Sequence, residues 1–459
     1  MKKEISLLLS LLLVFLLAGC SEATAGNALY NEMSTAPQTN ESLTVYCLGN
    51  DTGAKLMLAA LNRYKQLYPE VEVELIQPLT EFKNNTDPNE LMYYEQLSAQ
   101  IMAGEGPDVL LFNEEYIDVE KFVRQGIFAD MEPFFQADGF DWESYNQGVM
   151  DSGIWNGKRF VIPLGYTFPL LCTTREALEE TGFDVEACKD FQGFLDETTR
   201  YMEDPSQTRR LFSNALDPNP GVVGFFEQSG ASVVDHDKQT VDLSLPLFIS
   251  TVQWYKTVVD THPWEVNSSL VGGAAAVRDG QALWTTSVYG ADFDLFGTAG
   301  ALRTIGEAVT MPIRDVNGGI HAWVQYPVAV RSNSENLQNA YNFLKILLSP
   351  EIQYTNNRRF SVLHSATENY LTQVAQEAWV IKEGTDGFVS TNHPGLATNA
   401  PSQEEIHQLL ALTKEITGAY YQNNNTGAMY TMGQYLLRDA DFGETLKKAQ
   451  QQLEIYISE

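Results

Sequence analysis

The spacing of apolar residues from position 43 onward predicts alternating strands and helices. An apolar, β-prone run at 43–48 is followed by apolar residues at helical intervals through 57–67, and residues 71–75 then alternate between apolar and acidic side chains. A second helical pattern ends at Gly104, before the apolar run Val109–Phe112, which is typical of a strand buried on both faces of a parallel sheet. The order βαβαβ predicts an α/β fold with a mostly parallel sheet, flanked by helices and joined by right-handed crossovers.

Polar residues follow two of these predicted strands at their carboxyl ends. Asn50 and Asp51 come after the first strand, and Asn113, Glu114 and Glu115 come after the third. Ligands of such sheets bind beyond the carboxyl ends of the strands, so we expect both groups to line one edge. A simpler role is also consistent with the pattern, because Asp51 or Thr52 is a suitable cap for the helix that follows. The two roles do not exclude each other.

The first twenty residues have the pattern of an export signal. Lys2 and Lys3 precede an apolar run that falls short of the ~20 residues needed to span a bilayer, so we interpret residues 1–19 as a cleaved signal peptide. The segment before and including Cys20, Leu-Ala-Gly-Cys, resembles a bacterial lipobox, which implies a lipid on the Cys20 sulfur and an anchor on the outer face of the cell membrane. An ordinary secretory signal with an incidental Cys20 is the alternative. Residues 20–42 have few large apolar side chains and are predicted to form a flexible tether.

Composition narrows the class of protein further. Residues 43–459 are long enough for two domains of ~150 residues or more, and 44% of the chain is hydrophobic, which supports large cores. The net charge of −31 disfavours nucleic acid as a partner, because an acidic field repels phosphate backbones.

The cysteines predict neither a metal centre nor a redox motif. Besides Cys20 the chain has Cys47, Cys172 and Cys188, an odd number without a CxxC spacing. Cys47 and Cys172 lie in apolar runs and have the character of small core residues. A disulfide between Cys172 and Cys188 is an alternative that the sequence leaves open. We predict no metal and no cofactor.

Six short motifs, taken in order, resemble the bacterial extracellular solute-binding proteins of sugar-type ABC importers, the family that includes maltose-binding protein. Residues 103–109 are similar to its AGxxPDV motif, and 126–131 and 156–163 are similar to its G-x-[LF]-x-[DP]-L and GKxYxxP motifs. Residues 278–284 look like its GxxAM, with Trp284 at the methionine position and expected in the core. Two amphipathic helices, one at 336–351 and one at 442–455, complete the likeness.

The resemblance implies two lobes joined by strands that cross between them more than once. The crossings are expected near 164–166, 284–289 and 326–330. We therefore predict a first lobe of residues 43–165 and 285–328 and a second lobe of residues 166–284 and 329–459. A ligand that contacts both lobes would stabilise the closed form, which membrane permease subunits would then recognise. The resemblance implies a monomer that is not an enzyme.

The family's cargo, a hydroxyl-rich solute, needs aromatic rings for stacking and carboxylate or amide groups for hydrogen bonds. By position relative to the motifs, the predicted ligand-binding residues are Asn50, Asp51, Phe112, Asn113, Glu114, Glu115, Tyr166, Thr167, Phe225 or its neighbour Phe226, Ser287, Tyr289 and Trp323. Because aromatic residues make up 11% of the chain, each of these rings has packing as its alternative role.

Other functions remain open at this point. A surface-anchored hydrolase is one alternative: the chain has no GxSxG or HExxH motif, but its many carboxylates could supply the pair that a glycoside hydrolase needs. The same fold could instead bind a peptide, an amino acid or an anion, although an anion would need Arg and Lys side chains in the cleft. A sensor subunit that presents its ligand to a receptor is the third alternative.

Overall fold

The computed structural model describes most of the chain after the predicted tether. The described residues are 42–48, 52–78, 90–113, 117–213, 216, 221–236, 238–261, 273–285, 299, 302–355, 360–374, 378–381, 388–391, 402–421, 426–438 and 440–458. The predicted signal peptide, Cys20 and the tether up to residue 41 lie outside this part of the chain.

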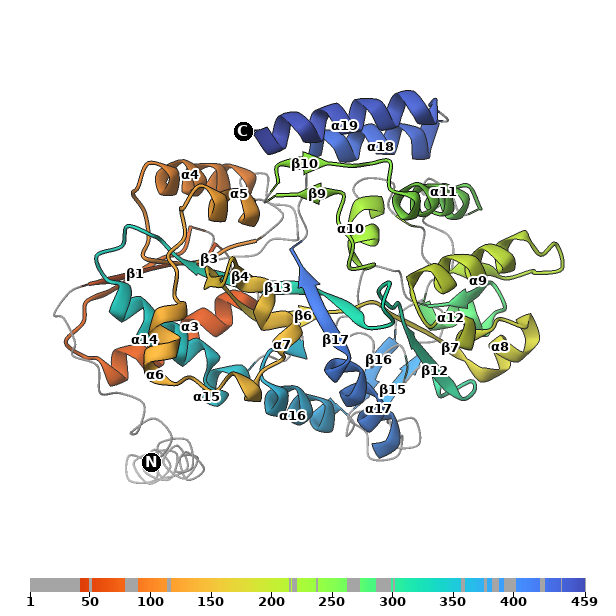
Figure 1. The fold of residues 1–459 in the computed structure, drawn as a ribbon. Coiled ribbons are helices and arrows are strands. Elements are labelled where there is room, and N and C mark those ends of the chain that lie inside the picture. The colour runs from red at the N-terminus through yellow and green to blue at the C-terminus, as the bar shows by residue number, and fades with distance from the viewer. Residues whose placement is uncertain are drawn as a thin grey trace, which may run out of the picture.

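A seven-stranded sheet forms the centre of the first lobe (Figure 1). Its path is β14-β6-β13-β3-β1-β2, and β17 adds to β13. β1 is parallel to β2 and β3, whereas β13 is antiparallel to β3 and β6. The strands are β1 (Leu43–Tyr46), β2 (Val73–Ile76), β3 (Val109–Leu111), β6 (Val161–Thr167), β13 (Ile320–Val330), β14 (Phe360–Ser361) and β17 (Ile416–Tyr420). The three predicted strands are confirmed, with β2 two residues later than expected because Val71 still donates to the Tyr68 carbonyl in a turn.

Helices pack on this sheet with their apolar faces inward. Those of the first half are α3 (Thr52–Leu67), α4 (Glu90–Met102), α5 (Val119–Arg124), α6 (Glu132–Asp138) and α7 (Gln147–Met150), with a short hairpin of β4 (Ile154–Trp155) and β5 (Lys158–Arg159). From later in the chain come α14 (Leu337–Leu348), α15 (Pro350–Gln353) and α16 (His364–Val374). Single 3₁₀ turns occupy Trp142–Ser144, Asp151–Gly153 and, in the other lobe, Val185–Ala187.

Helix α14 corrects the predicted lobe boundaries. Its Phe343 ring meets Tyr64 of α3 edge-on at 5.9 Å, and Glu351 of α15 pairs with Arg63 of α3 at 3.1 Å. The stretch from α14 to α15 therefore belongs with the first lobe, not with the second lobe to which residues 329–459 were assigned. The apolar stripe of α14 needs a partner surface, and sequence pattern alone does not say which lobe supplies it.

The second lobe is built from smaller sheets. β8 (Arg210–Phe212) is parallel to β11 (Ala282–Trp284), and β7 (Leu170–Thr174) is antiparallel to β12 (Ala308–Pro312). The Thr285 amide donates to the Cys172 carbonyl at 2.8 Å, which brings the two pairs together. Because β12 pairs with β7, residues 308–312 belong to the second lobe, which corrects the prediction that all of 285–328 lies in the first.

Helices surround these strands and bury an aromatic core. They are α8 (Arg175–Thr181), α9 (Phe191–Glu203), α10 (Gly221–Glu227), α11 (Pro246–Thr261) and α12 (Gly273–Arg278). Phe225 stacks on Trp254 at 4.7 Å, and Phe183 meets Trp284 edge-on at 5.5 Å. Trp284 is fully buried, as expected for a core residue.

The remaining elements complete the molecule. Two hairpins are formed by β9 (Val234–Asp235) with β10 (Thr240–Val241) and by β15 (Ala378–Ile381) with β16 (Phe388–Thr391). The C-terminal part forms α17 (Gln403–Lys414), α18 (Thr426–Arg438) and α19 (Phe442–Ser458), and α18 and α19 lie side by side above β9 and β10 (Figure 1). The predicted terminal helix is confirmed by α19.

The chain passes between the lobes at strand junctions. It leaves the first sheet at the end of β6 and enters the second lobe with β7, close to the predicted crossing at 164–166. It returns between β12 and β13, in residues 313–319, whereas residues 326–330 lie inside the first sheet. The predicted crossing at 284–289 falls mostly outside the described residues.

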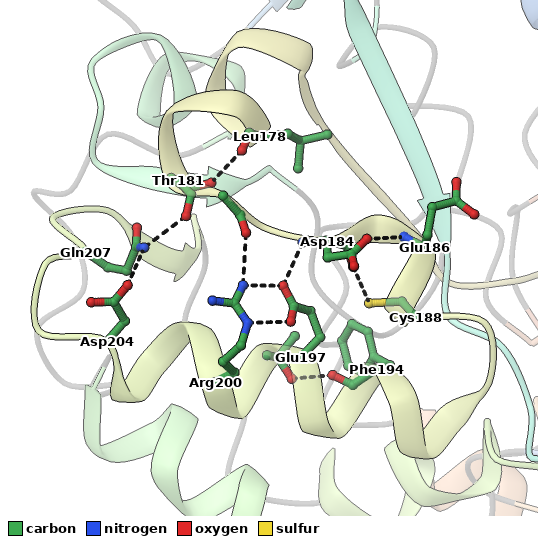
Figure 2. Close-up of polar contacts among 12 residues, drawn as sticks. Leu178, Thr181, Asp184, Glu186, Cys188, Phe194, Glu197, Arg200, Asp204 and Gln207 are labelled. Atoms are coloured by element: carbon green, nitrogen blue, oxygen red, sulfur yellow. Dashed lines mark hydrogen bonds and ion pairs between the residues drawn. The ribbon is translucent and has the colours of Figure 1, made fainter.

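Polar contacts hold the second lobe rigid around α9 (Figure 2). Arg200 pairs with Glu197 and donates to the Gly182 carbonyl at 3.0 Å, where a left-handed glycine ends α8. The buried Glu197 carboxylate also accepts the Asp184 amide at 2.6 Å. One charged pair thus fastens α9 to the end of the preceding helix.

The cysteines of this lobe do not form the alternative disulfide. Cys172 and Cys188 are both buried thiols, and the Cys188 sulfur lies 3.8 Å from the Asp184 carbonyl oxygen. Burial is the main cause that raises the pKa of Cys188 to about 12, and the nearby acidic groups are the second. This thiol is therefore protonated and unreactive at neutral pH.

Candidate functional site

Two of the family-like motifs fix the strands that lead to the site. Buried Asp108 accepts from the Thr44 amide at 2.8 Å and from the Ser334 hydroxyl at 2.6 Å, and Arg331 donates to the Gly104 carbonyl at 2.9 Å. These bonds join the starts of β1 and β3 to the end of β13. The starts of β1 and β3 and the end of β13 lie away from the β6–β7 connection, so these bonds hold the first sheet together at the end opposite the second lobe.

The second motif organises the turn before β6. Arg159 donates to the Glu132 carboxylate at 2.9 Å and to the Met150 carbonyl at 2.7 Å, and its guanidinium lies 4.0 Å from the centre of the Trp142 ring. Asn156 takes a positive φ of 51° beside Gly157, and together they form the turn between β4 and β5. This turn presents Trp155 toward the second lobe.

A cavity of about 260 Å³ lies between the lobes. The first lobe contributes α5, the segment 151–155 and the end of β17, and the second lobe contributes α10, the segment 230–236 and part of α11. Met432 of α18 and Leu453 of α19 close it from above. The cavity is therefore walled by both lobes and by the C-terminal helices.

Aromatic rings form one wall of this cavity. Trp155 and Tyr421 are stacked at 5.9 Å with planes 30° apart, and the Tyr421 hydroxyl is 3.4 Å from Ser152 Oγ. Next to them, Tyr420 stacks on His321 at 5.5 Å. Phe226 on the opposite side meets Phe248 edge-on at 5.1 Å. Such surfaces suit the apolar C–H faces of a ring-shaped solute.

Acidic groups supply the polarity of the cavity. Its lining includes Glu120, Asp151 and Glu227 and, among the residues that the structure describes, no Lys or Arg. Glu120 of the first lobe forms an ion pair with His236 of the second. Burial first, and the nearby Glu120 second, raise the pKa of Glu227 well above the usual range of a carboxyl group. The cavity therefore disfavours anions.

His321 lies at the cavity as a neutral ring. Its Nδ1 is 2.6 Å from the Glu227 carbonyl oxygen, which can only accept, so the proton is on Nδ1. Burial is the main reason that the pKa of His321 is lowered. At neutral pH the ring thus adds hydrogen-bonding capacity but no charge.

A second hollow, between β12 and α17, is a weaker candidate. Its charged groups are already paired with each other, Arg175 with Glu307 at 2.6 Å and Arg303 with Glu405 at 2.8 Å. It also lacks aromatic rings among its described lining residues. The cavity between the lobes is thus the better site for a solute.

The structure places several predicted ligand residues in the protein interior. Phe112 stacks on Phe128 at 5.7 Å, Tyr166 is fully buried with its hydroxyl near Asn146, and Phe225 lies in the second-lobe core. Thr167 is buried as well. These residues have packing roles in the described structure, and their predicted contact with a ligand stays a prediction.

The other predicted residues divide into two groups. Trp323 is half-buried in β13, opposite Thr167 and Tyr420, and the Asn113 amide donates to the Tyr94 hydroxyl at 3.2 Å, but neither residue lines the cavity. Outside the described residues lie Asn50, Asp51, Glu114, Glu115, Ser287 and Tyr289. Phe226, the named alternative to Phe225, does line the cavity.

Sequence reasoning missed most of the cavity residues, among them Trp155, Glu227, His236, His321 and Tyr421. Trp155 directly precedes the Asn-Gly turn of a family-like motif, which is a signal that could have identified it. Glu227 follows the two phenylalanines that were considered. The remaining three reach the cavity only through the pairing of distant strands.

With two lobes, linking strands and a cavity between them, this is the architecture of a two-lobed periplasmic-type binding protein. The sequence profile described as "Bacterial extracellular solute-binding protein" matches residues 49–354, about two thirds of the chain, and the protein belongs to this family. It is thus an extracytoplasmic binding protein and not an enzyme.

Solved structures confirm the fold. The sugar-binding protein MalE from Xanthomonas citri matches with a TM-score of 0.60 at 13% identity, over 91% of this chain and 97% of that one. A putative oligosaccharide-binding protein from Synechococcus sp. MITs9220 matches with 0.58 at 15% identity, over 91% and 99%. An ABC substrate-binding protein from Listeria monocytogenes in complex with cycloalternan matches with 0.54 at 13% identity, over 91% and 99%.

Within the described residues, none of the helices combines the length and apolar character that a membrane crossing requires.

Proposed function

We propose that this protein is the lipid-anchored solute-binding subunit of an ABC importer, and that it captures a small hydroxyl-rich solute, a carbohydrate, in the cavity between its lobes. The observation that carries the proposal is a cavity shared by both lobes, with stacked Trp155 and Tyr421 on the first-lobe side and the Glu227 carboxyl group on the second-lobe side. Two of the similar structures, a sugar-binding protein and an ABC substrate-binding protein in complex with cycloalternan, support the same class of cargo.

The mechanism follows from the positions of the lining groups. A solute stacked on Trp155 and bonded to the second lobe stabilises only the arrangement in which both walls are close. The lobes pivot on the connections from β6 to β7 and from β12 to β13. The closed, loaded form is then presented to the permease subunits, and the protein acts as a monomer.

Calorimetric titration tests the placement of the site. The mature protein is first screened by thermal shift with mono- and oligosaccharides, amino acids, peptides and phosphate esters, because a ligand selective for the folded state raises the melting temperature. We expect Trp155→Ala to weaken binding of the best sugar about tenfold or more, since a stacked ring contributes roughly 0.5–1.5 kcal/mol beyond its buried area. Tyr354→Ala, at an exposed tyrosine that follows α15 and does not line the cavity, is the matched control and should bind normally. Equal affinity in both variants, or stabilisation by a non-sugar alone, contradicts the proposal.

The lipid anchor needs its own experiment. We propose that Cys20 carries the lipid and that residues 20–42 link it to the lobes. Cys20→Ala should move the protein from the membrane fraction to the medium or periplasm and abolish incorporation of labelled palmitate. Retention in the membrane by the variant would contradict the anchor without affecting the proposed site.

A further inference from the structure

Glu227 has a position that packing does not explain. It ends α10 at the cavity wall, and its neighbours there include Phe226, Phe248 and Val223. The Glu227 side chain is half-buried and lines the cavity, and within the described part of the chain its carboxyl group makes no hydrogen bond and no ion pair. A carboxyl group at the wall of an acidic cavity, with no Lys or Arg among the described lining residues, is placed to pair with a cationic group that arrives with the ligand.

The charged and titratable groups around Glu227 limit which chemical group of a ligand could pair with its carboxyl group. From α5 it faces Glu120, whose charge is engaged with His236 at the end of the β9 segment. From β13 it faces the neutral ring of His321, and the wall beyond holds Asp151, Tyr420 and Tyr421. The parts of α18 and α19 that reach the cavity, around Met432 and Leu453, contribute apolar side chains. Among the described groups, no cation is directed at the Glu227 carboxyl group.

We propose that the cavity selects a solute that carries a basic amino group, such as an amino sugar, and that Glu227 binds this group as a carboxylate. The inference rests on the proposed function and specifies its cargo. An ammonium group would meet Glu227 on one side and the faces of Trp155 and Tyr421 on the other, and aromatic faces attract cations. The cavity volume of about 260 Å³ suits a unit of one or two sugar rings.

Proton exchange gives a readout that a neutral ligand would not produce. In the free protein, burial and Glu120 keep the pKa of Glu227 raised, so the carboxyl group holds its proton below that pKa. Binding of an ammonium ion favours the carboxylate, so the Glu227 proton leaves to solvent as the charge pair forms. Affinity should therefore rise with pH up to the raised pKa of Glu227, and it should fall again only where the ligand amine itself loses its proton.

Calorimetry in buffers with different ionisation enthalpies measures this exchange. The probes are glucosamine and the chitosan disaccharide, with N-acetylglucosamine, glucose and cellobiose as neutral counterparts. For an amino sugar we expect release of up to one proton on binding, and at least tenfold tighter binding than that of its neutral counterpart. Glu227→Gln, which cannot ionise, should lose that tenfold preference and the proton release. Glu179→Gln, at an exposed glutamate on α8, is the matched control and should keep both.

The outcomes separate this inference from the function on which it rests. If neutral sugars bind the wild type as tightly as amino sugars, or if Glu227→Gln keeps the preference, the amino-group inference is wrong and the proposed sugar-binding function stands. If no sugar of either kind binds, both are overturned. A circular dichroism spectrum unchanged from wild type shows that Glu227→Gln is folded.

Discussion

The two lobes of this protein are built differently, and they contribute different chemistry to the cavity between them. The first lobe rests on a seven-stranded sheet whose strand ends are joined by the Asp108 and Arg331 contacts. The second lobe has only paired short strands and depends on an aromatic core around Trp254. The first lobe contributes the stacked rings of Trp155 and Tyr421, together with Glu120 and Asp151, whereas the second lobe supplies Glu227, His236 and Phe226.

This difference indicates how closure of the two lobes could depend on which ligand is bound. Flat aromatic surfaces bind many ring-shaped solutes, so the first lobe alone would discriminate little. Under the proposed function, the Glu227 carboxyl group would disfavour a solute that leaves it unpaired, so the second lobe would add selectivity. Direct contacts already link the first lobe to the second lobe and to the C-terminal helices. Glu120 pairs with His236, and Arg124 of α5 donates to the Ile457 carbonyl of α19 at 3.2 Å.

The largest expected effect comes from breaking the aromatic core of the second lobe. Trp254→Ala removes a ring stacked on Phe225 and a hydrogen bond of 2.8 Å from its Nε1 to Thr198 Oγ1. We expect a loss of about 3–5 kcal/mol in the free energy of unfolding, the usual range for truncating a buried large aromatic residue. Urea denaturation followed by circular dichroism measures it. A loss below about 1 kcal/mol would show that the second lobe does not depend on this core.

The next largest effect is expected at the strand junction of the first lobe. Asp108→Ala leaves the Thr44 amide and the Ser334 hydroxyl without their acceptor and removes the carboxylate that lies 3.6 Å from Arg331. Each buried group left unsatisfied costs about 1–3 kcal/mol, so we expect a total near 2–4 kcal/mol. Asp196→Ala, at an exposed position on α9, is the control and should be neutral. Stability equal to that of wild type would contradict the role of the motif.

The sequence predicted the first lobe better than the second for a physical reason. The apolar runs 43–48 and 109–112 alternate with helical patterns, so the chain order itself indicates parallel neighbours in one sheet, and the structure confirms strands there at Leu43–Tyr46 and Val109–Leu111. The short pairs β8 with β11 and β7 with β12 join residues more than seventy positions apart, and three to five residues carry too little pattern to indicate a partner.

The candidate site shows the same limit. Phe225 and Phe226 are neighbours on one helical turn, and only the packing of α10 decides that the first enters the core and the second the cavity. Tyr326 adopts a positive φ of 56° in β13, with its ring against Gly53, a conformation that no propensity for tyrosine would predict. Residues from distant strands, such as His321 and Tyr421, meet only in the folded chain.

A smaller effect, on the pH dependence of stability, separates the two titratable groups of the cavity. The folded pKa of His321 is lowered, so the unfolded chain binds more protons and stability falls as the pH drops below about 6.5, the usual pKa of histidine. The folded pKa of Glu227 is raised, so stability falls as the pH rises above about 4.3 and through that raised pKa. Without ligand, Glu227→Gln should therefore melt at a higher temperature than wild type at pH 7. The His321→Gln variant should lose less stability than wild type at acidic pH.

Scanning calorimetry from pH 4 to pH 8 measures how the melting temperature of each variant changes with pH. Wild-type protein and Glu179→Gln should behave alike, since Glu179 is exposed on α8. A Glu227→Gln variant that melts below wild type at pH 7 would show that the carboxyl group stabilises the unliganded fold, against the role inferred for it.

The smallest effect is expected at the second hollow, where charged pairs lie at the surface. Arg175 and Glu307 are both more than half exposed, and solvent screens their contact of 2.6 Å. Arg175→Ala should leave the melting temperature and ligand affinity unchanged, although the pKa of Glu307, which the pair lowers, would return toward its usual value. If this variant instead weakened sugar binding as much as Trp155→Ala, the hollow between β12 and α17 would be part of the binding site. The assignment of aromatic faces to one lobe and of selectivity to the other would then fail.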